Sequence, residues 1–550
     1  MFVENNASCE QISMFNSTYG LTEREKKFLE KSWAKPFAEY IFPAIDEKPF
    51  SVLYSSEPSR GNTPVNVLVG ACILQQLTDL SDDEILNSLL FDIRFQYALH
   101  TVNMEEQPLS DRSLGRFRAR CIAYEAETGT DLLKNAVDSL NKQIAELMKI
   151  DHSLKRMDSM MIASNIRRMT RLELIYTCTA NLVRKVKKSG IEVPESLLHY
   201  TEDNDRNKVV YHSRSMAAGD RIDAILKDAK ILKELADLHI DRFCDSSEYL
   251  LFVRMLNEQT TIDDDGNYHL KQGKSAKAED AEETSGHAPA APMHSGILQN
   301  PADPDATFRE KDGKQYRGYA GNVTEESTSD GRYSIITDYQ YDSNNTSDQT
   351  FGKQALEGME PSEGGSVLVA DGLFHGGEME DIAKEKNITI LNTNLSGRCV
   401  PDFYAGFEFS SDGKHVTKCP GGFCPKKCSY NAKSGQCVAA FDRKQCESCP
   451  YHDQCRPRMN SKTSRKTISV KAKVRAEKQV YRSSEEFTKY SNYRNGVEAV
   501  PSFFRRHFHV DRMPVRGKLR TKFYFGCMVA ASNVMKFCTF MNSGEYCAQN

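Results

Sequence analysis

The sequence lacks a hydrophobic run long enough to cross a membrane. The most apolar stretch, residues 523–541, contains Ser532, Asn533 and Lys536, and the run 67–74 is too short to span a bilayer. The opening residues also lack a basic segment followed by an apolar one, so we expect no secretion signal. These absences predict a cytoplasmic protein with no membrane partner.

Extremes of composition are absent as well. Apolar residues make up 39%, charged residues 27% and aromatic residues 9% of the 550 positions, close to ordinary globular usage. This balance excludes a wholly disordered or fibrous chain, and the length corresponds to about three or four domains. The 16 cysteines are expected in a reducing compartment, where clustered cysteines favour metal or redox roles over disulfides.

Net charge is small, but the charge is distributed unevenly. The formal value of −4 by itself argues against a nucleic-acid-binding protein. Residues 456–522, however, hold 19 bases against 5 acids, with tyrosines and phenylalanines interleaved. Such a basic stripe could neutralise many phosphates, although a Lys-rich soluble surface has the same composition. Residues 258–312 hold 12 acids against 5 bases and are predicted to form a solvated linker.

Hydrophobic periodicity divides the chain into helical and mixed parts. Residues 60–148 repeat apolar positions every three or four residues, with a capping box at Ser81 and Glu84, and this pattern predicts a helical domain. A short strand is predicted at 154–162, followed by further helices over 168–251.

From residue 315 the pattern changes to that of strands. A hairpin with a turn at 329–331 precedes a helix near 348–358, an apolar strand that ends on an acid, a helix near 377–386 and a further strand from 388. This order predicts an α+β or α/β unit with a mixed sheet. Ligands of such sheets bind near the ends of the strands.

Three acidic residues fall on separate elements of this unit. Asp158 lies in the first predicted strand, Asp371 ends another strand, and Glu498 lies in a predicted helix of the basic stripe. Carboxylate oxygens suit Mg²⁺, and two such ions about 3.5–4 Å apart can promote cleavage of a phosphodiester. By spacing alone, an aspartate that ends a strand is more often part of a turn or a cap.

Several sequence blocks carry a more specific signal. The blocks RMDSMMIASN and SVLVADGLFHGG contain the two aspartates, and YRNGVEAVPSFFRR contains the glutamate. The other blocks are RGNTPVNVLVGACILQQLTDLSDDEI with SDRSLGRFRARC, YRGYAGNVTEE with SIITDYQYDSNNTSDQTF, and NITILNTNLSGR. Together and in this order, the blocks resemble bacterial insertion-sequence transposases of the DDE, RNase H-like superfamily.

The resemblance implies an RNase H-like mixed-sheet core with additions. The core strands would come from residues 151–165 and 315–395, and the basic part at 481–545 would carry the catalytic glutamate. The remaining parts would be a helical domain at 1–150 that binds DNA ends, a helical and acidic insertion at 166–314, and a Cys-rich insertion at 396–480.

The resemblance also implies a function. Asp158, Asp371 and Glu498 would be catalytic and would hold Mg²⁺, with Mn²⁺ as a substitute. The reaction would be phosphodiester hydrolysis at the ends of a mobile element, followed by attack of the freed 3′-hydroxyl on target DNA. The partners would be DNA and a second copy of the chain, in the cytoplasm and nucleoid of a bacterium. Two alternatives remain open, a nuclease without strand transfer and an inactive descendant that only binds DNA.

Basic residues flank the glutamate at the spacing that these transposases show. Their pattern is Tyr-x2-Arg-x3-Glu-x6-Lys, and this chain has Arg494, Glu498 and Arg505 at the last three positions, with arginine in place of lysine. Offsets of four and seven place these residues on one helix face, where the arginines would grip DNA phosphates. A simple ion pair between Arg494 and Glu498 is the alternative.

Two features of this block depart from the pattern. The tyrosine position falls on Ser491, although Tyr490 and Tyr493 lie nearby. Pro501 cannot continue a helix interior, so we expect the helix to kink or restart there.

A cysteine cluster occupies the second insertion. Seven of the 16 cysteines fall between positions 419 and 455. Zinc takes four thiolate or imidazole ligands in structural sites, and Cys446-x2-Cys449 is a common half-site. We expect Cys446, Cys449 and Cys455 as ligands, with His452 or an earlier cysteine as the fourth. Such a zinc ion would be structural or would position DNA. An unmetallated reduced cluster and a redox role are the alternatives.

Overall fold

The computed structural model describes most of the chain and divides it into two compact units. The first unit comprises Met1–His152, Asp158–Met359 and Val500–Asn550, and the second comprises Ser153–Met157 and Glu360–Ala499. The described residues are 1–5, 16–57, 61–102, 109–212, 217–271, 296–311, 313–374, 377–393 and 399–543. Much of the predicted acidic linker, residues 272–295, therefore lies outside the described residues.

Helices form the N-terminal part of the first unit. Ser81 and Glu84 make the predicted capping box at the start of α4. The principal helices here are α1 (Glu23–Glu30), α3 (Val65–Thr78), α4 (Asp82–Phe91), α6 (Ser113–Thr128) and α7 (Leu132–Leu147). Nearly every side chain of α3 is buried, which makes α3 the central helix of this part.

A second group of helices has a hydrophobic core of its own. It comprises α8 (Arg171–Lys188), α9 (Ala218–Leu238) and α11 (Ser247–Gln259). Tyr176, Leu182, Leu226 and Phe252 are buried in this core. The helical periodicity predicted over this region is confirmed.

The strands pair as a mixed sheet, as the sequence predicts. In the first unit, β5 (Lys314–Thr328) is antiparallel to β4 (Thr307–Lys311) and β6 (Ser334–Ser343). In the second unit, part of β1 (Ile150–Ala163) is parallel to β7 (Ser366–Ala370), which is parallel to β8 (Ile388–Asn392). The hydrogen-bonded order is β4-β5-β1-β7-β8, with β6 also beside β5. This mixture of parallel and antiparallel neighbours agrees with the RNase H-like core that the sequence predicts.

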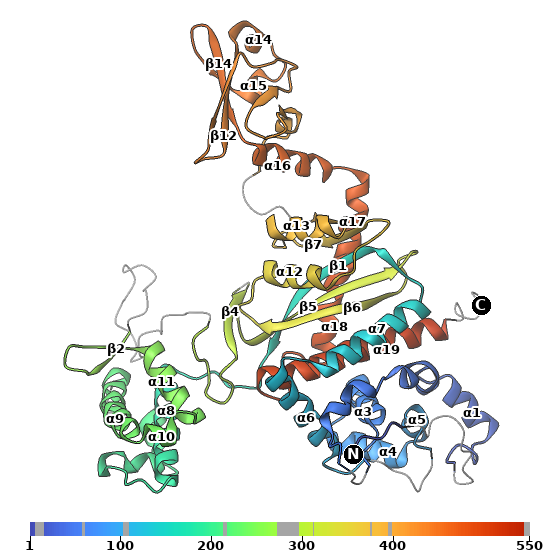
Figure 1. Cartoon of the computed structure of the whole chain (residues 1–550), viewed down its shortest axis with the longest axis vertical. Helices are drawn as coiled ribbons and strands as arrows, with labels where there is room; N and C mark the ends of the chain where they lie inside the picture. Colours follow the sequence, from blue (N-terminus) through green and yellow to red (C-terminus); the bar gives the residue numbers. More distant parts are fainter. Residues whose placement is uncertain are drawn as a thin grey trace. The chain divides into compact units, whose positions relative to one another are not determined.

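A second largely buried helix, α19 (Lys518–Asn542), lies in the interior of the first unit. It packs against α3, α6, α7 and β6. In Figure 1, α7 and α19 lie on one side of β6, and α12 (Asp348–Gly358) lies on the other. The many apolar side chains of α19 are buried by these neighbours on several sides of the helix. Among the described residues, no helix is long and apolar enough to span a membrane.

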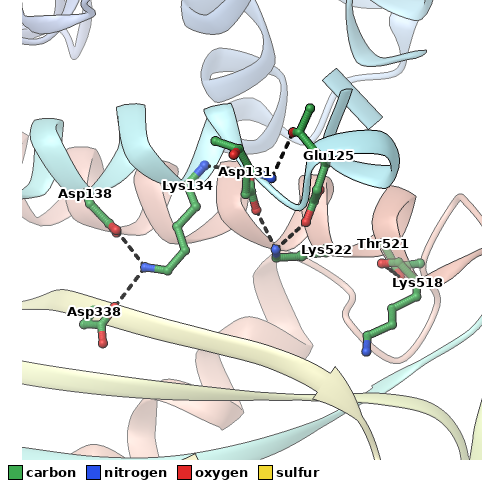
Figure 2. Close-up of polar contacts among 10 residues, drawn as sticks. Glu125, Asp131, Lys134, Asp138, Asp338, Lys518, Thr521 and Lys522 are labelled. Carbon is green, nitrogen blue, oxygen red and sulfur yellow. Dashed lines mark hydrogen bonds and ion pairs between the residues drawn. The ribbon is translucent and has the colours of Figure 1, made fainter. Parts of the chain in front are cut away.

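Ion pairs join α19 and β6 to the N-terminal helices. Figure 2 shows Lys522 between Glu125 and Asp131, with its ammonium 2.5 Å and 2.8 Å from their carboxylates. Lys134 reaches Asp138 at 2.7 Å and Asp338 at 2.9 Å. Burial alone would lower the pKa of Lys522, but the two neighbouring carboxylates outweigh burial and raise this pKa. Lys522 is therefore firmly protonated at neutral pH.

The second unit carries the Cys-rich segment and the start of the basic stripe. A four-stranded sheet has the order β11-β12-β14-β13. Its strands are β11 (Lys427–Asn431), β12 (Gln436–Asp442), β13 (Arg458–Met459) and β14 (Thr463–Ile468). The helices α16 (Val470–Tyr481) and α17 (Glu485–Asn495) follow, and α17 contacts β7. This contact brings the basic stripe to the parallel strands.

Candidate active site

Two aspartates follow the paired residues of neighbouring parallel strands. Arg156 of β1 pairs with Val369 of β7, and Asp158 and Asp371 each come two residues later. Both aspartates are half-buried. Each carboxylate accepts a hydrogen bond from the amide of the following residue, at 2.9 Å in Asp158 and 2.7 Å in Asp371. These contacts restrain each carboxylate while leaving it partly open to solvent.

A third strand supports the backbone beyond Asp371. Asn392, the last residue of β8, donates hydrogen bonds from its amide nitrogen to the carbonyls of Asp371 at 3.0 Å and Phe374 at 2.7 Å. Phe374 is fully buried and anchors the same turn. Asn392 therefore fixes the turn that carries the aspartate. Sequence reasoning placed the strand but missed this side chain, because its partners are backbone atoms of another segment.

The segment around Glu498 consists of two helices joined by a tighter turn. α17 ends at Asn495, a 3₁₀ turn covers Gly496–Glu498, and α18 covers Ala499–His507. Pro501 lacks the amide hydrogen that would bond four residues back, and its ring would crowd that carbonyl. The interruption expected from Pro501 is therefore found. A 3₁₀ turn thus interrupts the helix between positions 494 and 505, and the face expected for positions 494, 498 and 505 stays a prediction.

Arg494 and Glu498 form an ion pair within the second unit. The arginine Nη1 donates to the glutamate Oε1. The Arg494 side chain is only 9% exposed, whereas that of Glu498 is 61% exposed. The ion pair named as the alternative for Arg494 is thus present, with the arginine on the protein side and the glutamate open to solvent. Arg505 is exposed on α18, and its contact with phosphate stays a prediction.

A second arginine ties the helix before Glu498 to strand β1. The guanidinium of Arg156 lies over the ring of Tyr493, 4.7 Å from its centroid, and donates to the carbonyl oxygen of Tyr493 at 2.8 Å. The Tyr493 hydroxyl donates back to the carbonyl of Leu154 at 3.2 Å. A Cβ on Gly496 would clash with the guanidinium of Arg156. Arg156 and Tyr493 thus form a clamp that sequence reasoning missed, since Tyr493 was noted only as a neighbour of the expected tyrosine position.

The three predicted carboxylates belong to different units. Asp158 is part of the first unit, and Asp371 and Glu498 are part of the second. Within the described residues, no three His, Cys, Asp or Glu side chains are grouped so that they could hold a metal ion. The chemistry of the three side chains nevertheless fits a hard cation, because Mg²⁺ prefers carboxylate oxygens.

The Cys-rich segment brings its predicted ligands to one cavity. Cys446, Cys449, Cys455 and His452 line this cavity, and so does Cys419, which lies far upstream in the segment. The 14 cysteines in the described part of the chain are all free thiols. Cys419 is an earlier cysteine that lines this cavity, because chain folding rather than spacing brings it to the others, and a metal ion at these residues stays a prediction.

A polar groove lies beside α6 in the N-terminal helices. It encloses about 680 Å³, and Ser110, Ser113, Arg116 and Arg120 line one side of it. The Arg120 guanidinium lies 5.2 Å from the ring centroid of Tyr54, which also lines the groove. Arg116 and Arg120 are exposed and four residues apart, so they lie on one face of α6. This face presents positive charge to solvent.

Two segments of the chain match models of known protein families. Residues 25–120 match a transposase domain, DUF772, and residues 418–538 match a transposase DDE domain. The first segment contains Arg116 and Arg120 of the α6 groove, and the second contains the four cysteines of the cavity and Glu498. No curated protein and no solved structure matches the chain. Both matched segments are similar to transposase domains, and together with the mixed sheet they indicate an insertion-sequence DDE transposase.

Proposed function

We propose that this transposase cleaves the ends of its element and joins the freed 3′-hydroxyls to target DNA, using Asp158, Asp371 and Glu498. The observation that carries the proposal is the register of the parallel pair. Asp158 and Asp371 each stand two residues beyond Arg156 and Val369, which pair with each other. Equal steps along parallel neighbours bring side chains to one end of a sheet, where α/β proteins bind ligands.

Magnesium is the proposed cofactor, with Mn²⁺ as a substitute. Bound between the carboxylates, such ions would activate the attacking oxygen and stabilise the leaving oxygen of the phosphodiester. The protein's own part is to hold the carboxylates and the DNA. Arg494 restrains Glu498, and Arg505 is exposed on the following helix, where it would contact a phosphate. Phosphoryl transfer depends chiefly on such positioning and on charge stabilisation.

The N-terminal helices are proposed to bind the ends of the element. Arg116 and Arg120 line a groove with serine hydroxyls, a combination that suits a phosphate backbone. A homodimer would hold the two ends together. The domain roles predicted from the sequence, with the RNase H-like core at 151–165 and 315–395, belong to this proposal.

An excision assay in cells tests the proposed reaction. A plasmid carries the native flanking DNA of the element around a marker, and wild type is compared with Asp158→Ala, Asp371→Ala and Glu498→Ala. We expect excision and relocation with wild type and none with any of the three variants. Asp381→Ala is the control, because this exposed aspartate of α13 (Gly377–Glu385) lies outside the proposed triad and should leave excision unchanged.

Purified protein separates the alternatives. We expect nicking of element-end DNA with Mg²⁺ or Mn²⁺ and none with Ca²⁺, and we expect Asp158→Ala to bind DNA without cutting it. Cleavage by wild type without joining would indicate a nuclease without strand transfer. If the wild-type protein binds DNA without cleaving it, the protein is an inactive descendant and the proposed reaction is wrong.

A further inference from the structure

We propose that Cys419, Cys446, Cys449 and Cys455 bind a single zinc ion as four thiolates, with His452 outside the ligand set. This site is separate from the proposed DNA-cleaving carboxylates. It lies wholly within the second unit, in the segment 403–466. A structural zinc site with four cysteine ligands is closed to substrate and stabilises the fold around it.

The first ligand sits on a tight glycine turn. The amide of Gly422 donates to the carbonyl of Cys419 at 2.8 Å, and the amide of Cys419 donates to the carbonyl of Phe423 at 2.9 Å. Gly422 has a φ of +84°, which favours glycine. A Cβ on Gly421 would lie 2.7 Å from the sulfur of Cys449. The turn that carries Cys419 therefore lies directly against Cys449, with room only for glycine between them.

The other three cysteines come from two short helices and the link between them. Cys446 lies in α14 (Arg443–Glu447), Cys455 ends α15 (His452–Cys455), and Cys449 stands between the two helices. The amide of Cys449 donates to the carbonyl of Cys446 at 3.3 Å. This turn and the glycine turn present their cysteines to the same cavity from opposite parts of the segment.

His452 supports the turn, and four thiols at the same cavity complete a ligand set without it. Its Nδ1 lies 2.7 Å from the carbonyl oxygen of Cys446, so this nitrogen is engaged as a donor to the backbone. Its amide donates to the carbonyl of Cys449 at 2.9 Å. The histidine thereby links the two cysteines that flank the turn. With four thiols at the same cavity, an imidazole ligand is not needed.

Charge and size also favour one ion. Four thiolates around Zn²⁺ carry a net negative charge, and Lys466 lines the same cavity and donates to the carbonyl of Cys455. Its ammonium offsets part of that charge. The cavity volume is only about 30 Å³, which suits a single ion rather than a cluster of several irons.

The remaining cysteines of the segment have other surroundings. Cys424 is exposed. Cys437 is buried in β12, and its thiol donates to the carbonyl of Lys414 at 3.2 Å. Cys428 accepts from the amide of Val416 at 3.4 Å. None of these three lines the cavity in the part of the segment that the structure describes. As the structure describes them, the four thiols line one cavity but are not grouped closely enough to hold a metal ion, so binding requires them to converge as zinc displaces their protons to solvent.

Metal analysis of the full-length protein tests the site. We expect about one zinc per chain after gel filtration in reducing buffer, and at least about tenfold less in Cys419→Ser. Cys424→Ser and His452→Gln should keep their zinc. Loss of zinc in His452→Gln with retention in Cys419→Ser would overturn the assignment, as would a wild-type protein that holds no zinc and takes none up.

Wild-type protein provides a second test that does not depend on how the variants fold. Alkylation followed by peptide mapping should find the four cavity cysteines protected and Cys424 modified. Added chelator should expose all four together. Co²⁺ in place of zinc should give the absorption of a four-thiolate site. Protection of a different set of cysteines, or the absorption of a three-thiolate site, would refute the proposed ligands.

Discussion

Arg156 and Tyr493 lie 337 residues apart in the sequence and yet form one contact. The arginine stacks on the ring and bonds the carbonyl of the same tyrosine, and the tyrosine hydroxyl returns a bond to β1. Tyr493 stands five residues before Glu498, and Arg156 stands two residues before Asp158. The clamp therefore restrains the approaches to two of the proposed catalytic carboxylates.

Replacement of Arg156 by lysine should slow cleavage without preventing DNA binding. Lysine keeps the charge but loses the planar stack and the bond geometry of a guanidinium. We expect the rate of cleavage of element-end DNA to fall about 10- to 100-fold, because small misplacements of reacting groups slow a reaction by such factors. Single-turnover cleavage measures this effect.

The control for this change is Arg332→Lys, on the exposed hairpin tip between β5 and β6. It should cleave at the wild-type rate. Equal rates in the two variants, at equal melting temperatures, would show that the clamp has no part in positioning the carboxylates.

At the scale of elements, α19 joins the sheet to the N-terminal helices through a buried polar residue, Asn533. Asn533 is fully buried. Its Oδ1 accepts from the amide of Ile336 at 2.8 Å, and its Nδ2 donates to the carbonyl of the same residue at 2.7 Å and to the Oδ1 of Asn141 at 2.8 Å. The pairing of β5 and β6 shifts register beside Ile336. Asn533 therefore bonds both backbone polar groups of Ile336 beside this irregularity.

Replacement of Asn533 by leucine should destabilise the first unit. The side chain keeps its approximate volume, but the amide and carbonyl of Ile336 lose their partners in a buried position. We expect the free energy of unfolding to fall by about 2–6 kcal/mol, at about 1–3 kcal/mol for each of the two unsatisfied groups. Denaturant-induced unfolding measures it. The control is Asn542→Leu, at the exposed end of the same helix, which should change the free energy of unfolding by less than about 0.5 kcal/mol. A similar loss of stability in both variants would contradict the role assigned to the buried Asn533.

At the scale of the whole molecule, positive charge has more than one location. The sequence concentrates bases in residues 456–522, which begin in one unit and end in the other. The α6 groove adds a separate basic face within the N-terminal helices. A formal charge of −4 for the entire chain therefore says little about how it meets DNA.

The α6 groove should contribute to the salt dependence of DNA binding. Each lost phosphate contact should reduce the slope of log affinity against log salt concentration by about 0.9. We expect Arg116→Gln with Arg120→Gln to weaken binding of element-end DNA and to reduce the slope by up to about 1.8. Binding titrations at several salt concentrations measure this slope. Arg24→Gln, an exposed change on α1, should leave the slope unchanged. An unaltered slope in the double variant would remove the groove from the DNA interface.

The sequence by itself determined the element types and the order of the core. Periodicity predicted the helix at 348–358 and the strand at 366–370, because local patterning encodes which residues face the interior. The capping box at Ser81 depends on residues three positions apart and was predictable for the same reason. The blocks around Asp158, Asp371 and Glu498 pointed to a transposase, and the two family matches agree with that identity.

Tertiary structure alone decided the contacts that join distant segments. No local pattern links Arg156 to Tyr493 or Cys419 to Cys449, because such contacts depend on how separate elements pack. The 3₁₀ turn ending at Glu498 also required packing, since Pro501 signals an interruption without fixing its form. Periodicity records which side of an element is buried, whereas the partner on that side is chosen only when the chain folds.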